Sequence, residues 1–326
     1  MPTLARLHSS DRTPKTMLTT IECAGHPRDM GLAQGAASKA AIREEAARLG
    51  LSMNRSRRPS LRSLAIGAVR GVGAGREMFR HFAHLAERLE GIAKEADLPV
   101  DTVLAIHLSV RAGGAQAGVL SRRSTLRARS TASSVDVKHW CLERSLPQTS
   151  ATESGWIVRD SRPAVGFRSV EVTLPWLVSS VAGLNEGGLA VVAGPLLWGS
   201  PGRDGNPTSL LLVQECLQRF PDLEGALDWC SKRPVEGEQS LLLADASGAL
   251  ATVVVSGRER RIQLGEGELH LEGGEPPETP SGAVSAGAGE GRIWIDPCAG
   301  RLHLHMNGVD LDVELPRTKE AASEEG

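Results

Sequence analysis

The sequence is poor in aromatic residues, and this scarcity limits what the chain can bind. Its 326 residues include six Trp, four Phe and no Tyr, so that aromatic residues make up only 3% of the chain. Aliphatic side chains must therefore dominate the core, and a platform of rings on which nucleic-acid bases stack is not expected. The formal net charge of −2 also gives no general attraction to nucleic acid or to a membrane surface.

The chain lacks the usual sequence motifs of metal and cofactor sites. Its five cysteines are widely spaced and include no Cys-x-x-Cys pair, which argues against a zinc ribbon or a dithiol redox motif. His81 and His84, like His303 and His305, have no third ligand in register, so no metal is expected there. We expect no cofactor, and neither a phosphate-binding glycine loop nor a G-x-S-x-G nucleophile motif occurs.

Long hydrophobic runs are missing as well. No apolar run approaches the ~18 residues that suggest a membrane-spanning helix, and the polar start, MPTLARLHSSDRTPKTM, lacks the apolar segment of a secretory signal. The scattered, unpaired cysteines fit a reducing compartment. We therefore expect a cytoplasmic protein without membrane or nucleic-acid partners, and the basic segment 54–64 is predicted to be a solvated loop or helix start.

What the sequence does contain is a helical part followed by a part rich in strand patterns. After a polar tail, 1–20, apolar residues recur at helical spacing within 21–110. Gly, Ala, Ser and Arg dominate 111–140, which is predicted to be a linker. Strand patterns and two helices fill 141–318, and a charged tail, 319–326, ends the chain. This order predicts an α+β fold of layered sheets and helices.

Segments at residues 25–35, 89–107, 182–192 and 241–257 carry a resemblance to a known family. They read GHPRDMGLAQG, LEGIAKEADLPVDTVLAIH, AGLNEGGLAVV and LLLADASGALATVVVSG. Together, and in this order, they resemble motifs of the acyl-coenzyme A:6-aminopenicillanic acid acyltransferase family. These isopenicillin-N acyltransferase-like cysteine peptidases belong to the Ntn hydrolase superfamily.

The resemblance implies a fold, a maturation step and a reaction. The fold is a four-layer αββα sandwich, and the precursor cleaves itself before a cysteine. The thiol of that cysteine is the nucleophile and its new α-amine, with a pKa of roughly 7.7–8, is the base. The substrates would be a small-molecule acyl donor, such as an acyl-CoA, with an amine, an amide or a small peptide.

Carrying the family's functional positions over to this sequence selects a small set of residues. Cys141 follows the helical part and the linker, which is where the nucleophile is expected. The segment WIVRDSR, 156–162, stands at the family's Asn-x-Asp strand, and SLLLAD, 240–245, stands at the segment that helps form the oxyanion hole. The candidate catalytic residues are Cys141, Asp160 and Ser240, and the candidate substrate-binding residues are Arg159, Arg162 and Asn185.

This chain departs from the family pattern at the positions that matter most for chemistry. Trp140 precedes Cys141 where a small residue is usual. Asp160 stands at the Asn position, Arg162 stands at the position of the catalytic Asp, and Ser240 replaces an Asn. Two hypotheses follow: an acyltransferase or amidohydrolase processed before Cys141, and a catalytically degenerate relative that acts as a binding or structural protein. The turn that begins at Asn185 is either a structural hairpin or part of the site mouth.

Overall fold

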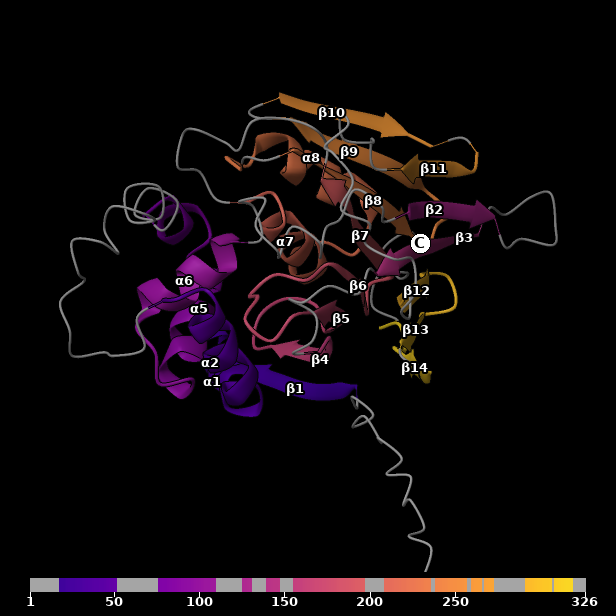
Figure 1. The fold of residues 1–326 in the computed structure, drawn as a ribbon. Helices are drawn as coiled ribbons and strands as arrows, with labels where there is room; N and C mark the ends of the chain where they lie inside the picture. The colour runs from indigo at the N-terminus through magenta and orange to yellow at the C-terminus, as the bar shows by residue number, and fades with distance from the viewer. Residues whose placement is uncertain are drawn as a thin grey trace, which may run out of the picture.

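The computed structural model describes residues 18–51, 76–109, 125–130, 139–146, 155–196, 208–235, 238–256, 259–265, 267–272, 291–306 and 308–318. Two stacked β-sheets form its centre, with helices beside them (Figure 1). The eight-stranded sheet contains, from edge to edge, β1 (Thr19–Gly25), β4 (Ile157–Pro163), β5 (Ser169–Thr173), β6 (Ala182–Asn185), β7 (Leu189–Leu196), β8 (Glu238–Asp245), β9 (Leu250–Ser256) and β10 (Glu259–Leu264). The six-stranded sheet contains β11 (Leu269–Glu272), β2 (Thr125–Ser130), β3 (Trp140–Leu146), β12 (Gly291–Asp296), β13 (Arg301–Met306) and β14 (Val309–Glu314).

The two sheets share an apolar interior because their strands alternate between apolar and polar side chains. In β3 the buried residues Trp140 and Leu142 alternate with the half-buried Cys141 and Glu143. The buried row of the six-stranded sheet faces the eight-stranded sheet, where Leu242 lies on the opposing surface. The predicted α+β class with two stacked sheets is therefore confirmed.

Helices cover the other face of the eight-stranded sheet, on the left in Figure 1. They are α1 (Pro27–Ala37), α2 (Lys39–Arg48), α5 (Ala83–Glu95), α6 (Val100–Ser109), α7 (Leu211–Arg219) and α8 (Leu223–Lys232). Helix α1 contacts β1 and β4, α7 contacts β6 and β7, and α8 contacts β8, β9 and β10. The described helices thus form one layer against one sheet, and the second helical layer of the αββα sandwich that the resemblance implies is not among the described elements. None of the described helices is long and apolar enough to cross a membrane.

Glycines allow α1 and α5 to cross at very short range. A Cβ at Gly91 of α5 would overlap the carbonyl oxygen of Arg28 and would lie 2.8 Å from the amide nitrogen of Leu32. A Cβ at Gly31 of α1 would likewise overlap the carbonyl oxygen of Arg88. Only glycine leaves room for the two backbones here, which explains why GHPRDMGLAQG carries glycine at this position.

Two segments differ from the division predicted from the sequence. The predicted linker, 111–140, contains β2, in which Leu126 and Ala128 point into the core while Arg127 and Arg129 point outward. Two apolar positions among arginines are too few to stand out as a strand pattern. The helical N-terminal region also supplies β1, which pairs in parallel with β4. The basic segment 54–64 lies outside the described residues.

The close crossing predicts that Gly91→Ala destabilises the fold. Although alanine favours a helix, overlap with the backbone of α1 should lower the free energy of unfolding by about 1–3 kcal/mol. Urea unfolding followed by circular dichroism measures this change. Gly267→Ala is the matched control, because a Cβ there has no atom within 4 Å. Equal stability of the two variants would contradict the crossing.

Candidate functional site

Cys141 lies on β3, with its side chain on the outer face of the six-stranded sheet. The neighbouring side chains, Trp140 and Arg144, belong to the buried row of the same strand. The guanidinium of Arg144 donates to the carbonyl oxygens of Val181, which directly precedes β6, and of Ala193 in β7 of the other sheet. This contact identifies the buried row as the one between the sheets, so Cys141 points away from the eight-stranded sheet.

The surroundings of Cys141 disfavour its thiolate. Burial raises the pKa of the Cys141 thiol, and the nearby carboxylates of Glu143 and Asp296 raise it further, to about 11. A backbone hydrogen bond from Ile295 and the charge of Arg129 act in the opposite direction but are outweighed. Because the thiolate is the nucleophilic form, Cys141 in the uncut chain is a weak nucleophile at neutral pH.

Trp140 has a structural role next to this cysteine. Its indole is 2% exposed, and Nε1 donates to the carbonyl oxygen of Gly248, in the turn between β8 and β9, over 2.9 Å. This bond fastens β3 to the opposite sheet. The Trp140–Cys141 peptide itself lies inside the sheet, opposite Ser130 and Arg129 of β2. The tryptophan therefore determines which way Cys141 faces.

Asp160 and Arg162 lie on β4 of the other sheet. Asp160 accepts hydrogen bonds from Arg168, over 2.9 Å, and from Arg162, over 2.6 Å. Burial alone would raise the pKa of Asp160, but the two arginines outweigh it and the net shift is downward. Arg162 also contacts Glu22 of β1. Both side chains thus belong to a charged network on β1, β4 and the segment before β5, and the structure does not bring them to Cys141.

Ser240 points into the space between the sheets. Its side chain is 2% exposed, and its Oγ has no hydrogen-bond partner among the described residues. The lack of a side chain at Gly194 makes room for this hydroxyl, because a Cβ there would overlap it. Ser240 and Cys141 therefore point to different sides of the six-stranded sheet.

Asn185 supports a turn. Its Nδ2 donates to the carbonyl oxygens of Leu217, over 2.9 Å, and Phe220, over 2.7 Å, at the end of α7. Its Oδ1 accepts from the backbone of Leu189 over 2.9 Å, and Gly188 closes the turn with a φ of 97°. These contacts favour the structural explanation of the GLNEGG segment.

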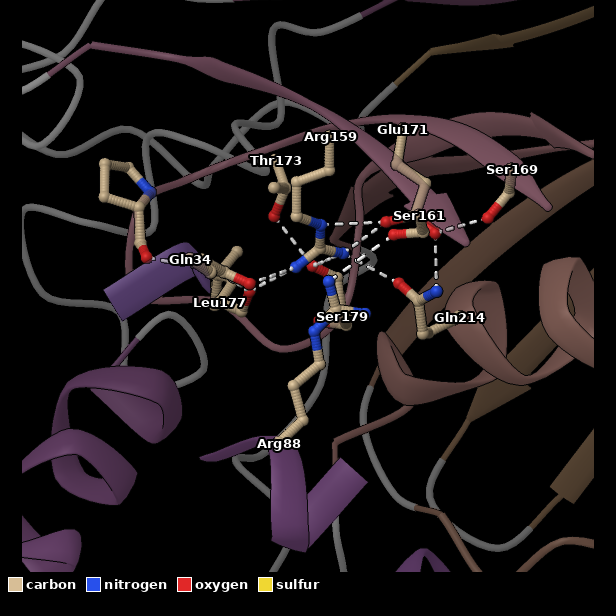
Figure 2. Close-up of polar contacts among 11 residues, drawn as sticks. Gln34, Arg88, Arg159, Ser161, Ser169, Glu171, Thr173, Leu177, Ser179 and Gln214 are labelled. Carbon is tan, nitrogen blue, oxygen red and sulfur yellow. Dashed lines mark hydrogen bonds and ion pairs between the residues drawn. The ribbon is translucent and has the colours of Figure 1, made fainter. Parts of the chain in front are cut away.

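Arg159 forms the centre of a buried polar cluster between the sheet and the helices (Figure 2). Its guanidinium bonds Glu171 of β5 over 2.6 and 2.8 Å, and both side chains are fully buried. It also donates to Gln34 of α1 over 2.9 Å and to Gln214 of α7 over 2.7 Å. We call the following set the Arg159 cluster: Gln34, Arg88, Arg159, Ser161, Ser169, Glu171, Thr173, Ser179 and Gln214.

The charges in the Arg159 cluster shift one another. Burial raises the pKa of Glu171, but Arg159, Arg88 and hydrogen bonds from Ser169 and Gln214 outweigh it, so the net pKa is lowered. Burial lowers the pKa of Arg88 to about 10, and the neighbouring charge of Arg159 lowers it too. The cluster holds two arginines against one carboxylate, so it keeps Glu171 ionised.

Sequence reasoning did not find Glu171, Gln34 or Gln214. Ser169, Glu171 and Thr173 alternate with valines in β5, which is the usual pattern of a strand with one solvent-exposed face. Only the helices packed on that face show that the polar row is buried. The sequence placed Arg159 in a substrate site, whereas its described contacts are all within the protein interior.

The described residues include no group of three or more His, Cys, Asp or Glu placed to hold a metal ion. His303 pairs with Asp312 over 2.6 Å, and His305 pairs with Asp310 over 2.8 Å. His84 contacts the buried Glu215 of α7 over 2.7 Å. These histidines have carboxylate partners within the fold.

No protein-family model and no curated protein matches the chain. Among solved structures, it is similar to penicillin V acylase from Agrobacterium tumefaciens, at 20% identity and a TM-score of 0.30, over 44% of this chain and 49% of that one. It thus spans about half the length of that enzyme. It is also similar to a mutant of conjugated bile acid hydrolase from Clostridium perfringens, at 9% identity and a TM-score of 0.36, over 59% of this chain and 92% of that one. A third structure, a Caenorhabditis elegans N-acylethanolamine-hydrolyzing acid amidase ortholog, gives 12% identity and a TM-score of 0.35, over 46% and 69%.

The Arg159 cluster predicts a large and pH-dependent loss of stability in Glu171→Gln. Removing one partner of a buried ion pair leaves Arg159 uncompensated, which costs about 3–5 kcal/mol. Because folding lowers the pKa of Glu171, its contribution is present above its ordinary value of 4.5 and is lost as the pH falls below it.

Urea unfolding of wild type and Glu171→Gln between pH 3 and 7 measures both effects, and the difference should shrink towards pH 3. Glu314→Gln, which removes an exposed partner of Arg301, is the control and should cost less than about 1 kcal/mol. A difference between wild type and Glu171→Gln that is constant with pH would contradict the lowered pKa.

The position of Cys141 predicts slow alkylation. With a pKa of about 11, roughly 0.1% of the thiol is ionised at pH 8, against about a quarter for a free cysteine of pKa ~8.5. Iodoacetamide should therefore modify Cys141 about 200-fold more slowly than it modifies free cysteine, and the rate should keep rising up to about pH 11. Peptide mass mapping over time measures this rate, and a plateau near pH 7 would indicate an activated thiolate instead.

Proposed function

We propose that this chain is a catalytically degenerate relative of the acyltransferases it resembles, and that it acts as an uncut binding or structural protein. The observation that carries the proposal is the orientation of Cys141. Its thiol is on the outer face of the six-stranded sheet beside Glu143 and Asp296, while Ser240 points between the sheets. A cysteine nucleophile needs a base and an oxyanion donor within hydrogen-bond reach of one reacting carbon.

The contacts of the other residues selected by the family resemblance support the same proposal. Arg159 is enclosed in the Arg159 cluster, Asp160 is shared by two arginines, and Asn185 holds a turn. Each of these polar groups has structural partners that a substrate would have to displace. We infer that the chain keeps the scaffold of the resemblance while these polar groups stabilise the fold.

A second candidate function is an amidohydrolase or acyltransferase that arises by cleavage of the Trp140–Cys141 bond. One observation favours it: Cys141 is the second residue of β3 and its thiol is only partly buried. Cleavage would create an α-amine at Cys141 that can take the thiol proton. The substrates would then be a small acyl donor with an amine, or an amide or short peptide, in the cytoplasm.

The mass of the purified full-length chain under denaturing conditions distinguishes the two functions. The first proposal predicts a single chain of 34.5 kDa after prolonged incubation, identical in wild type and Cys141→Ala apart from the substituted atoms. Hydrolysis of penicillin V and of an N-acylethanolamine should also be the same for both proteins.

Two fragments, the second beginning at Cys141, would overturn this proposal in favour of the second. So would an amide hydrolysis rate that Cys141→Ala lowers by the ~100-fold or more that is typical of removing a nucleophile. Cys141→Ala also controls for contaminating proteases. It cannot cleave itself before residue 141, whereas a contaminating protease would still cut it.

A further inference from the structure

Two buried cysteines, Cys216 and Cys230, face each other between α7 and α8. Cys216 and Cys230 are both 0% exposed, and their sulfur atoms are 3.5 Å apart. Disulfide sulfurs are separated by about 2.05 Å, so an approach of about 1.5 Å would join them. A change of rotamer at either cysteine moves its sulfur by a distance of this order.

Contacts on both sides of the cysteines hold the two helices in register. Nε1 of Trp229 on α8 donates to Glu215 of α7 over 3.0 Å, and the Trp229 ring packs at a tilt of 57° against the ring of Phe220, with 5.6 Å between the centroids. Arg219 of α7 lies 4.8 Å from the centre of the same ring. The two thiols are therefore held together by groups that do not depend on them, which raises their effective concentration.

The start of α8 is held as well. Asp222 caps the helix by accepting from the backbone of Gly225 over 3.0 Å, and Asp245 accepts from the backbone of Leu223 over 2.9 Å. While α8 is folded, the contacts at its start and at Trp229 keep Cys230, near its end, close to Cys216.

We propose that Cys216 and Cys230 are a modification site that closes to an intramolecular disulfide, with a low-molecular-weight disulfide as the oxidant. One thiolate attacks a sulfur of the oxidant, forms a mixed disulfide and releases one small thiol. The second thiolate attacks the protein sulfur of that mixed disulfide and releases the other small thiol. The two cysteines lose two electrons and two protons, and the small disulfide gains them.

The two cysteines react in a fixed order. Eight residues of α7 are buried, Leu211 through Gln218, whereas only Leu223, Ala226 and Cys230 of α8 are buried. Local unfolding therefore exposes α8 first, because fewer buried contacts oppose it. Cys230 is the entry thiol, and Cys216 is the resolving thiol.

The surroundings of Cys216 disfavour its thiolate. Its hydrogen bond with Cys230, together with burial, raises the pKa of the Cys216 thiol well above its ordinary value. Once Cys230 carries the mixed disulfide, its sulfur lies beside Cys216, which attacks it and closes the protein disulfide.

The disulfide would link α8 to the Arg159 cluster. Gln214, two residues before Cys216 on α7, bonds both Arg159 and Glu171, at 2.7 and 2.6 Å. The cross-link would thus join α8 to α7, the helix whose Gln214 bonds both residues of the buried ion pair. This inference does not rest on the proposed function, since neither cysteine belongs to the candidate site.

Equilibration of the full chain in mixtures of reduced and oxidised glutathione tests the proposal. Native protein and urea-unfolded protein are each alkylated at equilibrium, and the linked peptides are quantified by mass spectrometry. The native chain should form the Cys216–Cys230 link at a glutathione ratio at least 10-fold more reducing than the unfolded chain requires, since the folded helices hold the thiols together. The oxidised protein should also melt several degrees higher than the reduced one.

Matched serine variants test the order of reaction. Cys216→Ser should accumulate glutathione at Cys230, because the resolving thiol is gone. Cys230→Ser should leave Cys216 unmodified on the same timescale, while Cys23→Ser should leave the link intact. The peptide map of the wild-type protein detects the Cys216–Cys230 disulfide directly, so the test does not depend on the stability of the variants.

Three results would overturn the proposal. One is a link that forms no more readily in the native chain than in the unfolded chain. A second is a different cysteine pair in the oxidised native protein. The third is glutathione remaining on Cys230 of the wild type without resolution by Cys216.

Discussion

The buried ion pair between Arg159 and Glu171 is the constraint on which the rest of the structure depends. Two charges removed from water are costly unless every donor and acceptor finds a partner. Gln34 from α1 and Gln214 from α7 supply those partners, together with backbone oxygens of the loop after β5. The sheet can therefore hold this pair only when both helices are docked, and the helical layer and the sheet become one cooperative unit.

The same constraint explains why the family-like residues are dispersed. The side chain of Arg159 faces the helices, whereas the next residue along β4, Asp160, points to the opposite face and finds its partners there. Cys141 is turned outward by Trp140, whose indole is fastened to Gly248. Each residue is placed by its packing partner, and these partners lie in different layers. A reaction that requires these groups around one carbon atom would require them to leave their packing partners.

Periodicity in the sequence was sufficient for the elements with long apolar patterns. Leu85, Leu89 and Ile92 predict α5, and a layered α+β class follows from the order of helix and strand patterns, whereas the two stacked sheets are what the family resemblance implies. Periodicity was not sufficient for polar segments. Glu171 alternates with valines as a solvent-exposed residue would, so its burial was not predicted. Strand β2 has too few apolar residues to be recognised as a strand. The direction of Cys141 also could not be read, since it depends on a hydrogen bond between Trp140 and Gly248, two residues far apart in the sequence.

The parallel pairing of β1 with β4 has a consequence for what a break in the chain would do. The segment before residue 131 contributes β1 to one sheet, β2 to the other, and the tightly crossed pair of α1 and α5 to the helical layer. A cut between Trp140 and Cys141 would leave all these strands and helices hydrogen-bonded and packed against the second fragment. A chain cut at this bond would therefore stay assembled. The two fragments would migrate as one complex in native buffer and would separate only when the sheets unfold.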